Sequence, residues 1–246
     1  MSSSLHVDIK VARKDGFALE VAFEAPPGVT ILFGPSGSGK STTLAAIAGL
    51  IAPDAGRIAL GEDTWFDHAR GESRAIHRRG VAYVFQSLAL FPHMTALRNV
   101  AYGIDRNLPR AERLERAAQM LARMKVAHLT ARKPATFSGG EAQRVALARA
   151  FAMSPRLVLL DEPFSAMDRA LRRDLATDVR SVVDETSLPL VHVTHHRNEA
   201  RALGDRVVLL EAGRVKASGK VDDLLPPLDE RNDIGDSPVP SLRRRS

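Results

Sequence analysis

The sequence predicts an α/β fold in which a mainly parallel sheet follows an antiparallel hairpin and is interrupted by a helical lobe. Short apolar runs alternate with helix-forming segments along most of the 246 residues, as expected for parallel strands joined by helices. A glycine-rich loop at residues 34–42 joins one such run to an Ala- and Leu-rich segment. Between residues 85 and 155 helical patterns replace the strand-like runs. These features indicate a layered core with an inserted lobe.

The first predicted element is the hairpin. Apolar side chains alternate with polar ones over residues 5–11 and again over residues 17–23, which is the pattern of strands with one buried face. Asp15 and Gly16 supply a turn between the two runs. We therefore expect two antiparallel strands ahead of the glycine-rich loop.

The parallel part of the sheet is predicted from short runs of Val, Ile and Leu. Residues 29–33, directly before the glycine-rich loop, are expected to form a buried strand, and residues 41–50 a helix. Further core strands alternating with helices are expected at residues 57–60, 81–84, 157–160, 190–193 and 207–210.

The helical lobe is expected at about residues 87–155. Thr95 can cap one helix, and Pro109 can begin another. Apolar side chains at helical spacing follow Pro109, and we interpret them as ordinary core packing. These side chains belong to Leu114, Ala117, Leu121 and Met124.

Composition limits the remaining classes. No run approaches the ~18 apolar residues of a membrane span, and the first residues lack the layout of a signal peptide, so we expect a cytoplasmic location. The chain has no cysteine, which excludes disulfides and thiolate metal sites. The net charge of +6 includes three arginines at residues 243–245, and no aromatic side chains are interleaved with them, so no nucleic-acid partner is expected. Residues 226–246 are predicted to be a disordered tail after a domain of residues 1–225.

The glycine-rich loop predicts a cradle for the phosphates of ATP. Glycines let successive backbone N–H groups turn toward phosphate oxygens, and the following helix N-terminus adds partial positive charge. Lys40 can reach the β- and γ-phosphates, and the Ser41 hydroxyl can ligate Mg²⁺. The predicted cofactor-binding residues are Gly34, Pro35, Ser36, Gly37, Ser38, Gly39, Lys40, Ser41 and Thr42.

Two carboxylates follow the predicted strand at residues 157–160. Asp161 lies at the carboxyl end of this strand, where α/β folds bind ligands, and its oxygens suit Mg²⁺, usually through a water. Glu162 can polarise an attacking water as a general base. Two carboxylates at a strand end are a weak signal alone, but with the phosphate cradle they predict an ATP site.

A second anion-binding helix N-terminus is predicted where Ser138, Gly139 and Gly140 open a helical pattern. This segment resembles the signature motif of ATP-binding-cassette (ABC) ATPases. The resemblance implies that these three residues bind nucleotide as well. It also implies a P-loop NTPase fold with an antiparallel β subdomain, a RecA-like parallel-sheet core and an inserted helical subdomain.

Three further positions match motifs of the same family, in family order. Gln86 resembles the Q-loop glutamine, which implies contacts with Mg²⁺ and the attacking water. The segment Ser165-Ala166-Met167-Asp168 is similar to the D-loop, which implies that Asp168 lies near nucleotide. His195 resembles the switch histidine, which implies that it senses the γ-phosphate. The resemblance extends over about residues 5–225.

The chain departs from the family at several positions, none of which removes a catalytic group. Phe137 replaces the usual Leu, Glu141 replaces the usual Gln of the signature, and His196 stands where Asp is common. The aromatic residue that stacks on the base has no match at the usual distance before the loop. Phe17 is the nearest candidate but lies too close to Gly34 in the sequence. The use of GTP therefore stays open.

The resemblance also implies partners. Each ATP in the family lies between the phosphate loop of one chain and the signature helix of another, so a head-to-tail homodimer is expected. A single cassette without a membrane span resembles the ATPase subunit of a bacterial importer, at the cytoplasmic face of the inner membrane. The implied partners are an integral-membrane permease and, indirectly, a periplasmic or extracellular solute-binding protein. The alternatives are a soluble ABC protein of DNA repair or translation, and a cassette that binds ATP without hydrolysing it.

Local matches indicate one kind of importer. Residues 28–34, 78–86, 90–93 and 213–219, together with Glu141, are similar to the ATPases of molybdate importers. The expected solute is therefore molybdate or a related oxyanion, and importers of sulfate, thiamine, iron or sugar remain alternatives. Molybdate-importer ATPases usually continue into an oxyanion-binding domain. Only residues 226–246 follow the cassette here, so we expect this domain, and regulation through it, to be missing.

Overall fold

Eleven strands form one mixed sheet in the part of the chain that the computed structural model describes, residues 3–12, 16–164 and 167–227. Their order across the sheet is β6-β5-β4-β1-β2-β11-β10-β3-β9-β8-β7. The strands are β1 (Leu5–Ala12), β2 (Ala18–Ala25), β3 (Gly28–Phe33), β4 (Ala55–Leu60), β5 (Asp63–Asp67), β6 (Glu72–Ser73), β7 (Val81–Val84), β8 (Leu157–Asp161), β9 (Pro189–Thr194), β10 (Arg206–Glu211) and β11 (Arg214–Lys220).

The predicted hairpin is confirmed. β1 and β2 pair antiparallel from Leu5 opposite Ala25 to Ala12 opposite Ala18, and buried side chains alternate with exposed ones along both strands. Asp15 of the predicted turn lies outside the described residues. The hairpin is the centre of the antiparallel part of the sheet, with β4 paired to the other side of β1.

The expectation that residues 57–60 belong to the parallel core is wrong. They lie in β4, which pairs antiparallel with both β1 and β5. Only Gly61 and Glu62 separate β4 from β5, and so short a connection can join only antiparallel neighbours. The strands β5, β6 and β11 were not predicted, because their sequences lack a continuous apolar run.

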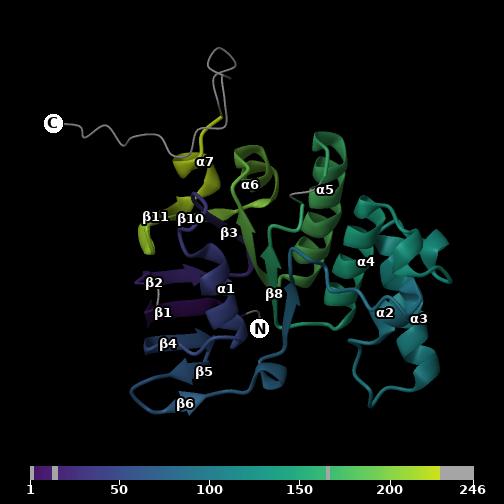
Figure 1. Cartoon of the computed structure of the whole chain (residues 1–246), viewed down its shortest axis with the longest axis horizontal. Coiled ribbons are helices and arrows are strands. Elements are labelled where there is room, and N and C mark those ends of the chain that lie inside the picture. The colour runs from purple at the N-terminus through teal and green to yellow at the C-terminus, as the bar shows by residue number, and fades with distance from the viewer. Residues whose placement is uncertain (1–2, 13–15, 165–166, 228–246) are drawn as a thin grey trace.

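The parallel core contains β10, β3, β9, β8 and β7 in that order, which confirms the predicted α/β fold. Leu157 and Leu159 of β8 pack in a cluster with α1 (Lys40–Ala48), whereas Val158 and Leu160 pack in a cluster with α5 (Arg169–Thr186) and α6 (Arg197–Leu203). Figure 1 shows α1 beside the hairpin and α5 on the other side of β8. Because helices cover both faces, the core strands are largely apolar, and the polar residues Thr30, His192 and Thr194 within them are buried as well.

The helical lobe lies between β7 and β8 in the sequence, and it projects to one side of the molecule (Figure 1). It contains α2 (Ala96–Ala101), α3 (Arg110–Arg123) and α4 (Gly139–Ala152). Thr95 caps α2 and Pro109 precedes α3, as predicted. The apolar stripe of α3 is core packing, with full burial of Ala117, Leu121 and Met124 and partial burial of Leu114.

The described chain ends shortly after α7 (Val221–Leu224). The limits of the domain at residues 1–225 and of the lobe at about residues 87–155 stay predictions, and residues 228–246 of the predicted tail lie outside the described residues. None of the helices within the described residues combines the length and apolar content needed to cross a membrane.

Arg79 joins the end of α1 to the antiparallel part of the sheet. Its side chain is 2% exposed, and its guanidinium donates to the carbonyls of Ala46 at 3.2 Å and Ile47 at 2.7 Å, near the C-terminus of α1. It also donates to the carbonyl of Trp65 in β5 at 3.4 Å. Burial lowers the pKa of Arg79, but a guanidinium remains cationic. A cation at the negative end of a helix is favourable, so Arg79 fixes the helix that follows the glycine-rich loop.

We expect Arg79→Met to lower the free energy of unfolding by about 3 kcal/mol, because buried carbonyls at the end of α1 lose their donor. Denaturant-induced unfolding measures this change. Arg78→Met is the matched control, because Arg78 is exposed, and its effect should stay below ~0.5 kcal/mol. Equal losses in the two variants would contradict the anchoring role of Arg79.

Candidate functional site

The glycine-rich loop takes its shape from contacts that exclude side chains. β3 ends at Phe33, and α1 begins at Lys40. A Cβ atom at Gly34 would lie 2.1 Å from the carbonyl oxygen of Leu210 in β10. Gly39, the N-cap of α1, has a φ of +101°, a conformation that L side chains rarely adopt. Both positions therefore require glycine.

The Lys40 side chain folds back over this loop. Its Nζ donates to the carbonyls of Gly34 at 2.8 Å and Pro35 at 2.9 Å, and the residue is only 6% exposed. Burial lowers the pKa of Lys40, whereas nearby Glu162 and Asp161 raise it. A buried cation held by neutral carbonyls gains strongly from an added anion such as phosphate.

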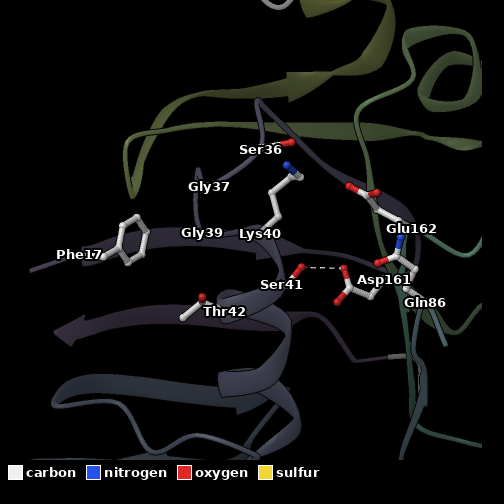
Figure 2. A pocket seen from close by; sticks show the side chains of 10 residues that line it. All are labelled: Phe17, Ser36, Gly37, Gly39, Lys40, Ser41, Thr42, Gln86, Asp161 and Glu162. Atoms are coloured by element: carbon white, nitrogen blue, oxygen red, sulfur yellow. Dashed lines mark hydrogen bonds between the residues drawn. The ribbon is translucent and has the colours of Figure 1, made fainter. Parts of the chain in front are cut away.

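The loop forms one wall of a pocket of about 440 Å³. Figure 2 shows that the other walls come from the end of β8, from the residue at position 86 and from an aromatic ring near the loop. The lining residues are Phe17, Ser36, Gly37, Gly39, Lys40, Ser41, Thr42, Gln86, Asp161 and Glu162. The glycine-rich loop, Gln86 and the acidic pair therefore meet at one pocket, although three residues of the loop do not line it, namely Gly34, Pro35 and Ser38.

Asp161 is held by two hydroxyl groups. Ser41 donates to its Oδ1 at 2.9 Å, shown as a dashed line in Figure 2, and Tyr83 of β7 donates to its Oδ2 at 3.1 Å. While the Ser41 hydroxyl donates its hydrogen bond to Asp161, the lone pairs of the Ser41 oxygen stay available to a cation. Ser41, Gln86 and Asp161 thus offer the hard oxygen atoms that Mg²⁺ prefers, and the residues present fit the predicted metal site. Tyr83 belongs to none of the motifs that predict site residues. Only the pairing of its strand, β7, with β8 could have indicated that it contacts Asp161.

Glu162 and His195 form a polar pair at the edge of the pocket. Glu162 has a φ of +47°, which is uncommon for a residue other than glycine, and its N–H donates to the carbonyl of Val193 at 3.1 Å. Its Oε1 lies 3.2 Å from Nδ1 of His195. His195 does not itself line the pocket. His195 therefore reaches the site only through the Glu162 carboxylate.

Phe17 lies in the pocket, although its distance from the loop in the sequence argued against it. Glu20 of β2 donates its N–H to the carbonyl of Gly213 at 2.7 Å, and Gly213 donates to the carbonyl of Ser38 at 3.2 Å. These bonds tie the start of β2 to the phosphate loop. A Cβ atom at Gly39 would consequently lie 3.1 Å from Cζ of Phe17. The pairing of distant strands, rather than sequence distance, brings this ring to the site.

The predicted signature residues lie outside the pocket, at the start of α4. The Ser138 side chain accepts from the N–H of Glu141 at 3.3 Å, while Oε2 of Glu141 accepts from the N–H of Ser138 at 2.7 Å. Oε1 of Glu141 also lies 2.9 Å from Nε2 of His128. The pKa of Glu141 is lowered to about 2. The hydrogen bond with His128 contributes most to this shift, and the hydrogen bonds with Ser138 contribute next. The residue that departs from the family signature thus completes a capping box.

The two glycines of this segment have different surroundings. A Cβ atom at Gly139 would meet nothing within 4 Å, whereas one at Gly140 would lie 2.5 Å from Cδ2 of Leu171 in α5. Gly140 therefore lets α4 approach α5 closely. Gly139 leaves open space beside Ser138, where a ligand or a second chain can approach.

Asp168 does not line the pocket either. It is the N-cap of α5, and its side chain accepts from the N–H of Leu171 at 2.9 Å. Ser165 and Ala166, at the start of the predicted D-loop, lie outside the described residues. Of the residues predicted to bind nucleotide, one chain therefore brings only some to its pocket. Residues 138–140 and Asp168 do not line that pocket.

A phosphate loop between a strand and a helix, facing an acidic strand end across a parallel sheet, defines a phosphate-loop nucleotide-binding protein. The chain belongs to the ABC transporter family, whose model matches residues 20–165. The matched range includes the glycine-rich loop, Gln86, the signature segment and the acidic pair.

Similar relatives share one name. The chain is 42% identical over 233 residues to the molybdenum import ATP-binding protein ModC of Brucella melitensis, and 45% identical over 218 residues to that of Rhizobium meliloti. These matches cover 95% and 87% of this chain but only 64% and 59% of the relatives. The chain thus spans less than two thirds of the length of these curated relatives.

Solved structures confirm the predicted fold as that of ABC cassettes. The cbiO1 protein of Clostridium perfringens, part of an ABC transporter complex, matches with a TM-score of 0.80 and 25% identity over 91% of this chain and 90% of that chain. A bacterial ABC transporter cassette solved as a dimer matches with a TM-score of 0.75 and 29% identity over 89% of this chain and 98% of that chain. The same cassette has been solved in a post-hydrolysis state with ADP and phosphate.

Proposed function

We propose that the chain is the ATP-hydrolysing subunit of an importer and powers the passage of a solute through a membrane permease. The observation that carries the ATPase part is the pocket, because the phosphate loop, Gln86 and the acidic pair all face it. Molybdate or a related oxyanion is the proposed solute, on the basis of the relatives named ModC.

ATP would bind through its phosphates and its base. The glycine-rich loop and the N-terminus of α1 supply N–H donors and partial positive charge for the phosphates. Lys40 supplies a full charge from within the loop. Phe17 lies beside the loop and offers an apolar face for the base. Stacking tolerates every base, so GTP remains an alternative.

Hydrolysis would use the acidic end of β8. When bound to Ser41, Gln86 and Asp161, Mg²⁺ supplies positive charge to the β- and γ-phosphate oxygens. Glu162 takes a proton from the attacking water, whose oxygen bonds to the γ-phosphorus as the bond to the bridging oxygen breaks. His195 lies against Glu162 and can donate to the γ-phosphate, so it also stabilises the negative charge of the phosphoryl group that is transferred to water.

The position of the signature segment favours a head-to-tail homodimer. Ser138, Gly139 and Gly140 belong to the predicted nucleotide set, but they do not line the pocket of their own chain. In a dimer, Ser138 and Gly140 of one chain would donate to the γ-phosphate held by Lys40 of the other. ATP then becomes part of the interface, and its hydrolysis lets the dimer open. The cassette solved as a dimer supports this arrangement.

The permease would dock beside Gln86 and the helical lobe. Phe85, directly before Gln86, is 38% exposed, which places a large apolar side chain on this surface. Binding there would hold the chain at the cytoplasmic face of the inner membrane as a peripheral subunit. A periplasmic or extracellular solute-binding protein would act on it only through the permease, and no nucleic acid is involved.

Other importers remain alternatives, because ATPases for sulfate, thiamine, iron or sugar share these motifs and the solute is selected by other proteins. A soluble ABC protein of DNA repair or translation is a rival from another class. A cassette that binds ATP without hydrolysing it is a third reading, and the paired Glu162 and His195 argue against it.

Phosphate release tests the ATPase part. The wild-type chain should release phosphate from ATP in the presence of Mg²⁺. Glu162→Gln should bind ATP, form dimers in size-exclusion chromatography with ATP, and hydrolyse it at least ~100-fold more slowly, because it lacks the general base. Lys40→Ala should instead lose nucleotide affinity. The exposed Glu211 supplies the control, Glu211→Gln, which should keep full activity. Rapid hydrolysis by Glu162→Gln would remove that residue from the base role.

Phe17→Ala should weaken ATP binding about tenfold, because stacking contributes roughly 1–3 kcal/mol per base. Calorimetry with ATP and with inorganic triphosphate separates the base from the phosphates, and binding of the triphosphate should stay unchanged. Phe17→Trp keeps an aromatic face and should restore affinity for ATP. Parallel losses for ATP and triphosphate in the alanine variant would show that Phe17 shapes the loop instead of binding the base.

Uptake by the native host tests the importer part. Cells that lack this chain should lose high-affinity uptake of radiolabelled molybdate while sulfate uptake in the same cells continues. A gene copy for the wild-type chain should restore uptake, and a copy carrying Glu162→Gln should not. Unchanged molybdate uptake with loss of another solute would reassign the substrate, and unchanged transport of every solute would favour the soluble class.

A further inference from the structure

Tyr83 donates a hydrogen bond to the carboxylate oxygen of Asp161 to which Ser41 does not donate. It lies opposite Leu159 in the parallel pairing of β7 with β8, and its ring packs against the cluster on the α1 side of the sheet. Its hydroxyl donates to Oδ2 of Asp161 at 3.1 Å, while Ser41 donates to Oδ1 at 2.9 Å. Each carboxylate oxygen is therefore fixed by a donor from a different element.

The chemistry of the donor suits a carboxylate that serves a cation. An ordinary tyrosine hydroxyl is protonated at neutral pH, and against an ionised carboxylate oxygen it can only donate, as the 3.1 Å contact with Oδ2 of Asp161 requires. A tyrosine hydroxyl is neutral. It orients Asp161 without cancelling its charge, whereas a lysine or arginine in the same place would compete with a metal ion for that charge.

The ring of Tyr83 is itself held in place. Its centroid lies 4.1 Å from that of Phe85, with the two planes tilted by 32°. Phe85 is followed directly by Gln86, another predicted metal ligand. A tyrosine has only two main side-chain torsions, so packing of the ring fixes where the hydroxyl points.

We propose that Tyr83 is a positioning residue for the Mg²⁺ site, whose hydroxyl holds Asp161 turned toward Ser41 and the cation. Groups that hydrogen-bond to a metal-binding carboxylate fix its orientation, and their loss typically weakens metal binding about 10–100-fold. Because the metal enters with the nucleotide, this inference rests on the proposed ATP site.

The test measures metal affinity without hydrolysis. Mn²⁺ replaces Mg²⁺ as a hard cation visible by electron paramagnetic resonance, and it is titrated into protein held in excess over ADP. Tyr83→Phe keeps the ring but removes the hydroxyl, and should raise the Kd for Mn²⁺ about tenfold. Affinity for ADP in EDTA should stay unchanged, which a general structural defect would not allow. The chain's other tyrosine supplies the matched control, since Tyr102 is 47% exposed and Tyr102→Phe should leave the Kd for Mn²⁺ unaltered.

A double-mutant cycle assigns the effect to Asp161. In an Asp161→Asn background, Tyr83→Phe should change the Kd for Mn²⁺ by less than about twofold, because the two residues act as a unit. An unchanged Kd in Tyr83→Phe, or the same tenfold loss in the Asp161→Asn background, would overturn the inference while leaving the ATP site intact. If the wild-type chain bound neither ADP nor Mn²⁺ with ADP, the proposed function itself would fail.

Discussion

The whole site depends on the register of parallel strands around β9. Leu32 of β3 and Asp161 of β8 both lie opposite Val193, from the two sides of β9. On the far side of β8, Val84 of β7 lies opposite Leu160. The chain consequently leaves β3, β8 and β7 at the same level, and the glycine-rich loop, the acidic pair and the Q-loop glutamine emerge at one edge of the sheet. A slip of one residue would turn the side chains of a strand to its other face and separate these groups.

The charged groups of the site are held by neutral groups. Lys40 donates to carbonyls of its own loop, and Asp161 accepts from the hydroxyls of Ser41 and Tyr83. Neutral dipoles orient both groups and leave their charges available. An anion near Lys40 and a cation near Asp161 would each meet groups that are already in place, which reduces the reorganisation needed when ligands bind.

Features set by local order could be predicted from the sequence, and features set by strand pairing could not. The phosphate loop needs only a strand, a glycine-rich turn and a helix in succession, and the acidic pair follows a single buried strand; both lie where the sequence places them. Phe17 reaches the pocket only because the start of β2 bonds to Gly213 beside the loop. Tyr83 meets Asp161 only because β7 pairs with β8. The direction of β4 likewise follows from the short connection after Leu60, which an apolar run does not reveal.

The helical lobe is bonded to the site through one rigid element. At the start of α4, Ser138 forms the capping box, and near the other end Arg149 donates to the carbonyls of Leu88 and Ala89 at 2.8 Å each. Leu88 and Ala89 have positive φ values of 58° and 45°, a backbone conformation that persists only when its surroundings hold it. Residues 86–89 begin at the pocket with Gln86, so the bonds from Arg149 connect the segment that carries Gln86 to the helix that Ser138 caps. The signature segment is therefore connected to the pocket of its own chain through α4 and Arg149, even though it does not line that pocket.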